Sequence, residues 1–293
     1  MNTLWIIFSV LAFSAVSLLT RLFQVKGARS ERDTDLFQSL FCLVSGMVYF
    51  FRAGTVGETE PLFLLMAGLF GVFFAFASLF SAVCFRWGPM SLTSVIVNGS
   101  VVFPVLYSCL VFGESITSPQ IVGCLLLLIT FCLSAFQSGG TDKKVNIRWL
   151  FLLLIAFFSN GATAVIQKQF KVSLPQANGS AFMSLSYITA AVVLLFSFFL
   201  KKRETATSVR RQGKELLFLA LLIVTAGLSS FIGNGVLLEL STKVPAALLY
   251  PFVNGGLCVA VSIGSVLFFR EKLTWKKTAT IVIGLLSVIV LNI

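Results

Sequence analysis

Long apolar stretches, separated by short polar segments, follow one another along the whole chain. A transmembrane helix needs about 20 predominantly apolar residues to cross roughly 30 Å of hydrocarbon. Ten stretches meet this requirement, namely 3–22, 36–52, 62–85, 90–112, 119–137, 148–168, 180–200, 215–238, 246–269 and 275–292. They lack the apolar–polar alternation of a membrane β-barrel. The pattern therefore predicts an all-α polytopic membrane protein with about ten transmembrane helices. The first stretch is too long for the apolar region of a signal peptide, so we expect it to be the first of them.

Several features recur in the second half of the chain at an offset of 156 residues. In order, the matched pairs are Gly71 with Gly227, Pro89 with Pro245, Asn98 with Asn254 and, after a slip of one residue, 112–117 with 269–274. Chance recurrence of one glycine or proline is common, but four matches in order are not. The repeat predicts two units of five helices, 1–140 and 141–293. Because five is odd, the second unit inserts upside down, as in many secondary transporters whose substrate site lies near the midplane.

Composition supports a membrane protein and excludes several other classes. Hydrophobic residues make up 57% of the chain and charged residues only 11%, whereas soluble domains carry roughly 25% charged residues. The six cysteines lie in apolar runs without a Cys-x-x-Cys pair, and there is no histidine, so we expect neither a metal nor another cofactor. No G-x-x-x-x-G-K-[ST] phosphate loop and no catalytic constellation is present, which argues against an ATP-driven pump and against an enzyme.

The net charge of +11 reflects membrane orientation rather than nucleic-acid binding, because the basic residues lie in the loops. The odd-numbered loops carry 18 Lys and Arg residues and the even-numbered loops carry 4. The positive-inside rule then predicts that the odd-numbered loops are cytoplasmic and that both termini lie outside.

The two predicted units end in similar motifs. The first unit has Gly-Glu-Ser-Ile-Thr at 113–117 followed by Gly123, and the second has Arg-Glu-Lys-Leu-Thr at 270–274 followed by Gly284. This arrangement resembles the drug/metabolite transporter superfamily, and in particular its ten-helix EamA-like branch. The second unit also has the Ser159-Asn160-Gly161 stretch and Lys168 typical of the family's first helix, whereas the first unit departs from it at 13–21. The resemblance implies a transporter with cytoplasmic termini, so the orientation stays open.

Polar residues within apolar spans are the candidate substrate-binding residues, because their burial in lipid needs a reason. They are Asn98, Asn254, Asn160, Gln167, Asn234, Tyr107 and Tyr250. Asn98 and Asn254 occupy equivalent repeat positions near mid-span, and each precedes a glycine. Asn160 and Gln167 lie two turns apart on one helix face, and Asn234 aligns with Ser78. Hydrogen bonding between helices is the competing interpretation for all of them.

Three prolines, Pro104, Pro245 and Pro251, lie within or at the start of the fourth and ninth spans. Proline removes a backbone hydrogen bond and bends a helix, so these positions could act as gates or hinges, or as fixed kinks. No Asp or Glu lies at mid-span. This argues against the proton-coupled mechanism of small multidrug exporters, and it favours a neutral, zwitterionic or anionic metabolite.

These observations favour a secondary transporter that moves a small metabolite, such as an amino acid or a related polar solute, by alternating access. We expect it to be an exporter in the cell membrane, monomeric or homodimeric, with membrane lipid and its solute as partners and no nucleic acid. A non-transporting scaffold or accessory subunit and a multidrug exporter are the alternatives.

Overall fold

The computed structural model describes residues 2–28, 30–54, 60–88, 90–113, 117–119, 121–126, 129, 147–201, 213–270 and 275–291. The secondary structure in these ranges is helical. The helices with defined bounds are α1 (Asn2–Lys26), α2 (Glu31–Ala53), α3 (Pro61–Trp87), α4 (Met90–Asn98), α5 (Val102–Phe112), α7 (Ile147–Ser173), α8 (Gly179–Leu200), α9 (Gly213–Leu240), α10 (Ala246–Phe269) and α11 (Trp275–Leu291), with one turn of 3₁₀ helix, η1 (Gly99–Val101).

Seven of the helices in these ranges are long and apolar enough to cross a membrane: α1, α2, α3, α7, α8, α9 and α10. They correspond to seven of the ten predicted spans. The tenth predicted span is α11, with 17 residues. Of the fifth, 119–137, only 119, 121–126 and 129 are described. Pro89 and most of the motif segments 112–117 and 269–274 also lie outside the described residues. The protein is a helical, multi-pass membrane protein.

The fourth predicted span is interrupted at its centre. Helix α4 ends at Asn98, η1 follows directly, and α5 begins at Val102. Pro104, in the first turn of α5, has no backbone N–H to donate to the carbonyl of Ser100, which loosens the helix at this level. Short 3₁₀ turns inside a helix are found where a helix is strained or hinged.

The ninth predicted span differs from the fourth, because α10 is continuous. Pro245 precedes its first turn, and its carbonyl accepts hydrogen bonds from the backbone N–H groups of Leu248 and Leu249 at 3.0 and 2.9 Å. Pro251 lies buried inside the helix. Of the three prolines, Pro104 therefore accompanies a break, Pro251 lies within an unbroken helix and Pro245 begins one.

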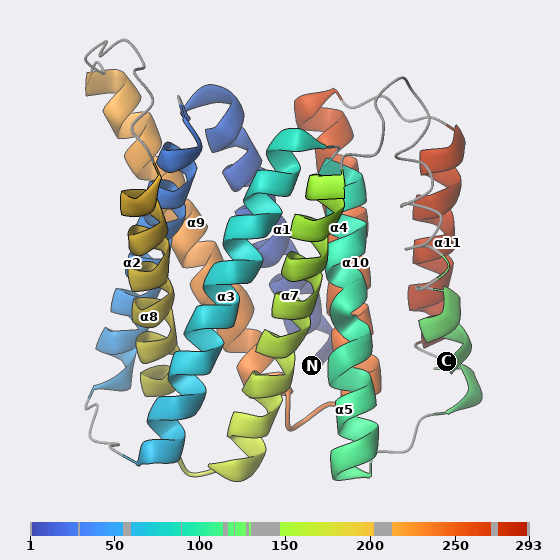
Figure 1. The fold of residues 1–293 in the computed structure, drawn as a ribbon. Helices are drawn as coiled ribbons and strands as arrows, with labels where there is room; N and C mark the ends of the chain where they lie inside the picture. The colour runs from blue at the N-terminus through green and yellow to red at the C-terminus, as the bar shows by residue number, and fades with distance from the viewer. Residues whose placement is uncertain are drawn as a thin grey trace.

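Helices from the two halves of the chain pack between one another (Figure 1). Helix α2 packs against α8, α3 packs against α7 and α8, and α1 packs against α9 and α10. Helix α11 lies at one edge of the bundle beside α10. Small residues allow the closest of these approaches. A Cβ on Gly71 would overlap the carbonyl oxygen of Ser186 on α8, and one on Gly227 would lie 3.0 Å from the carbonyl oxygen of Phe41 on α2.

Charged groups join helices at the two ends of the bundle. At the end that carries the first and seventh loops, the Lys201 ammonium lies 2.7 Å from the buried carboxylate of Asp35. The Ser197 hydroxyl donates to the same carboxylate at 2.8 Å. At the opposite end, Lys171 pairs with Glu239 at 3.7 Å.

Candidate functional site

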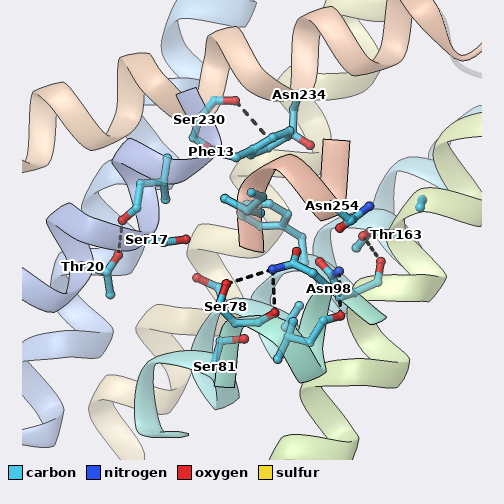
Figure 2. Close-up of a pocket in the computed structure, with 18 of the residues that line it drawn as sticks. Phe13, Ser17, Thr20, Ser78, Ser81, Asn98, Thr163, Ser230, Asn234 and Asn254 are labelled. Carbon is cyan, nitrogen blue, oxygen red and sulfur yellow. Dashed lines mark hydrogen bonds between the residues drawn. The ribbon is translucent and has the colours of Figure 1, made fainter. Parts of the chain in front are cut away.

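A cavity of about 180 Å³ lies in the middle of the bundle, among α1, α2, α3, α4, α7, α9 and α10. A single buried water needs only about 10–15 Å³, so the space is large enough for a small solute. In Figure 2, Asn98, Asn254 and Thr163 lie on one side of the cavity, and Ser17 and Thr20 lie on the other. Aromatic rings, including Phe13, complete the lining, and no charged side chain of the described residues belongs to it.

The structure brings together six of the seven candidate binding residues from the sequence. Those lining the cavity are Asn98, Asn160, Gln167, Asn234, Tyr250 and Asn254. They come from four helices, α4, α7, α9 and α10, which belong to both halves of the chain. Ser78, which the repeat aligns with Asn234, lines the same cavity.

The two repeat-related asparagines make equivalent contacts. The Asn98 side-chain amide donates to the carbonyl of Ser94 one turn earlier, at 2.7 Å, and to the Ser94 hydroxyl at 3.0 Å. The Asn254 amide donates to the carbonyl of Tyr250 one turn earlier, at 2.8 Å. Each side chain is thus held against its own helix while it lines the cavity.

The α7 candidates bond to other helices instead. Asn160 donates to the Ser100 hydroxyl at 2.8 Å and to the carbonyl of Val97 at 3.4 Å, which ties α7 to the broken fourth span. Gln167 donates to the backbone carbonyl of Asn234 on α9 at 3.1 Å. Both the cavity and the packing interpretations of these residues therefore have a structural basis.

Tyr187 on α8 is a residue that the sequence analysis missed. Its hydroxyl lies 2.6 Å from the Ser230 hydroxyl and accepts from the Asn234 amide at 2.9 Å. The ring is 1% exposed and stacks on Tyr49 of α2. Tyr187 does not line the cavity, but it fixes two residues that do. No repeat signal marks this position, so the sequence offered no reason to single it out.

Gln38 on α2 was also missed, and it lines the cavity. Its amide donates to the carbonyl of Ser78 at 2.9 Å, and the side chain is 2% exposed. It lies close to the predicted start of the second span, where a polar residue is expected at the membrane interface. The helix instead begins at Glu31, which moves Gln38 two turns into the bundle.

Tyr107 lies outside the cavity lining, in contrast to Tyr250. Its hydroxyl donates to the Gln169 side-chain oxygen at 2.7 Å and so joins α5 to α7. The hydroxyl of Tyr250 donates to the carbonyl of Ala164 at 3.1 Å. The three prolines likewise lie outside the lining.

Substituting Tyr107 by phenylalanine removes a hydrogen bond between α5 and α7 and is expected to cost about 0.5–1.5 kcal/mol of folding free energy. Thermal unfolding of the purified protein measures this loss. Tyr250→Phe is the matched variant inside the cavity, and we expect it to alter solute uptake more than Tyr107→Phe does. Equal effects of the two variants on uptake would contradict the distinction.

Comparisons with known proteins agree with this arrangement of helices. Residues 147–293, half of the chain, match the family model of the EamA-like transporter family. An uncharacterised protein of Haemophilus influenzae is 27% identical over 186 residues, which are 60% of this chain. The chain spans 58% of the length of that relative. A crystal structure of another protein has the same fold, with a TM-score of 0.67 and 14% identity, over 97% of this chain and 95% of that one.

Proposed function

Because this chain belongs to the EamA-like transporter family, we propose that it is a secondary transporter that exports a small polar metabolite, such as an amino acid, across the cytoplasmic membrane. Family membership and the apolar helices support a multi-pass membrane protein that transports small solutes. The substrate class, the direction and the alternating-access mechanism are the proposal.

The observation that carries the proposal is the central cavity. It is lined by amides, hydroxyls, aromatic rings and aliphatic side chains, without a charged side chain from the described residues. A lining of this kind suits a neutral or zwitterionic solute, because amides and hydroxyls both donate and accept hydrogen bonds. Its aromatic walls provide apolar contact, as in most small-molecule sites.

The proposed architecture has two inverted five-helix units, 1–140 and 141–293. The packing supports it. The repeat equates α3 with α9 and α1 with α7, and both α3 with α7 and α9 with α1 are in contact. Gly71 approaches α8, and its repeat partner Gly227 approaches α2. The family match covers 147–293, which is nearly the whole second unit.

Alternating access requires that the two ends of the bundle open in turn. Similar aromatic contacts lie at both ends and support this mechanism. Near one end, Phe23 of α1 stacks on Phe37 of α2, with ring centroids 4.3 Å apart. Near the other end, Phe170 of α7 stacks on Phe182 of α8 at 3.8 Å. We propose that separation of one pair opens the cavity to one side while the other pair stays closed.

Transport by the purified full chain in liposomes tests the proposal. With amino acids and related metabolites as labelled solutes, at least one is expected to cross faster than in protein-free vesicles. Asn98→Ala and Asn254→Ala are each expected to lower its initial rate at least tenfold, because both residues line the cavity.

Gln24→Ala is the control, because Gln24 is also a helix amide that donates to a backbone carbonyl, that of Ala82, but lies outside the cavity lining. Size-exclusion elution of each variant checks that it is folded. If no solute crosses faster than through empty vesicles, or if both asparagine variants transport at the full rate, the proposed function is wrong.

A further inference from the structure

The amide side chains of the cavity share one orientation. Each donates its NH₂ group to a backbone carbonyl of the protein. The pairs are Gln38 with Ser78 at 2.9 Å, Asn98 with Ser94 at 2.7 Å, Asn160 with Val97 at 3.4 Å, Gln167 with Asn234 at 3.1 Å, Asn234 with Ser230 at 3.3 Å and Asn254 with Tyr250 at 2.8 Å.

A backbone carbonyl can only accept a hydrogen bond, so these contacts decide which end of each amide is the nitrogen. The six side-chain oxygens are then turned away from those carbonyls. Among the described residues, no donor bonds to any of the six oxygens. Gln38 differs from the others, because it is 2% exposed and its Oε1 atom is itself buried, without a hydrogen-bond partner in the described part of the chain.

Two threonine hydroxyls in the lining add to this imbalance. Thr20 donates to the carbonyl of Val16 at 2.8 Å, and Thr163 donates to the carbonyl of Asn160 at 2.7 Å. Their protons are used within the protein, and their lone pairs remain. The amide oxygens and the two threonine hydroxyls therefore offer acceptors to the cavity, whereas the hydroxyls of Ser17, Ser78 and Ser81 can donate as well as accept.

We infer that the cavity recognises its solute through the solute's own N–H groups, as in the primary ammonium of an amine or of a zwitterionic amino acid. The amide oxygens accept these hydrogen bonds. An anion without N–H groups would meet the amide oxygens without a donor for them, so we expect it to bind more weakly than a solute that carries N–H groups. This inference rests on the proposed function, because it takes the cavity to be the transport site, and it places solutes with N–H groups ahead of the anionic metabolites considered above.

Matched solutes test the inference in liposomes that contain the full chain. The series comprises the common amino acids, their N,N,N-trimethyl derivatives, which keep both charges but lack N–H groups, and the corresponding 2-oxo acids, which lack the nitrogen. For every amino acid that is transported, we expect each counterpart to compete at least tenfold more weakly. Equal competition by either counterpart would overturn the inference while leaving transport itself intact.

Variants separate recognition from packing. Asn254→Leu removes the amide acceptor while keeping the branched shape of the side chain, and it is expected to raise the KM for an amino acid at least fivefold, whereas the Gln24→Leu control, outside the lining, leaves it unchanged. Asn254→Asp keeps an oxygen and adds negative charge. We expect it to shift competition at least fivefold toward the amine that lacks the carboxylate, a change that a purely structural role would not produce.

Two further outcomes are decisive. If uptake depends on sodium and the N-methylated solutes are still transported, the amide oxygens bind a coupling cation, and the inference is wrong. If no amine, amino acid or acid crosses faster than through empty vesicles, both the proposed function and the inference are wrong.

Discussion

Replacing Lys201 by methionine is expected to destabilise the folded protein by about 3–5 kcal/mol, the usual cost of removing one partner from a buried ion pair. The Asp35 carboxylate is 3% exposed and lies 2.7 Å from the Lys201 ammonium. Without that ammonium, the carboxylate keeps the Ser197 hydroxyl but stays buried without a counter-charge. Thermal or denaturant unfolding of the purified protein in detergent measures this loss of stability. We also expect α2 to associate less strongly with α8.

The double variant Asp35→Leu with Lys201→Met distinguishes the buried charge from lost packing. It removes both charges, so we expect it to be more stable than Lys201→Met alone. Lys214→Met is the matched control, because Lys214 lies exposed at the start of α9. If Lys201→Met and Lys214→Met are equally stable, the ion pair does not hold the two helices together.

Alanine at Gly71 is expected to destabilise the protein by about 1–3 kcal/mol, because the added methyl group overpacks a helix contact. Its Cβ would overlap the Ser186 carbonyl and lie 2.7 Å from the Thr189 Cβ on α8. A backbone carbonyl cannot rotate away, so α3 and α8 must separate. Thermal unfolding checks the loss, and Gly227→Ala, the repeat-related change against α2, is expected to behave alike.

Gly68→Ala provides the contrast on the same helix. Nothing lies within 4 Å of a Cβ at that position, and alanine is the better helix former by about 1 kcal/mol. We therefore expect Gly68→Ala to be neutral or slightly stabilising. A destabilisation equal to that of Gly71→Ala would mean that general helix perturbation, rather than contact with α8, explains the result.

The repeat in the sequence singled out residues that the structure brings together at one cavity. Asn98 and Asn254 line one cavity and make the same contact one turn back along their helices, as equivalent positions should. Asn160 and Gln167 also line it, because two helical turns separate them and return to the same face. Their roles in binding stay predictions until transport is measured.

Sequence reasoning was weaker where a residue's surroundings come from another helix. Tyr107 and Tyr250 looked alike as aromatic hydroxyls within spans, yet Tyr107 follows the break at η1 and bonds to Gln169 outside the lining. Gln38 lies near the start of the predicted second span, 36–52, but α2 begins at Glu31 and so places Gln38 two turns into the bundle. Neither distinction is encoded in local hydropathy.

The sequence by itself determined that this chain is a helical membrane protein, because an apolar run long enough to cross a bilayer must satisfy its own backbone hydrogen bonds there. It also singled out Asn98, Asn160, Gln167, Asn234 and Asn254 as polar residues within apolar runs. Only the tertiary structure decided in which direction the side-chain amide group of each residue points. The partners of Gln38, Asn160 and Gln167 are carbonyls on other helices, and packing alone brings these within hydrogen-bonding distance.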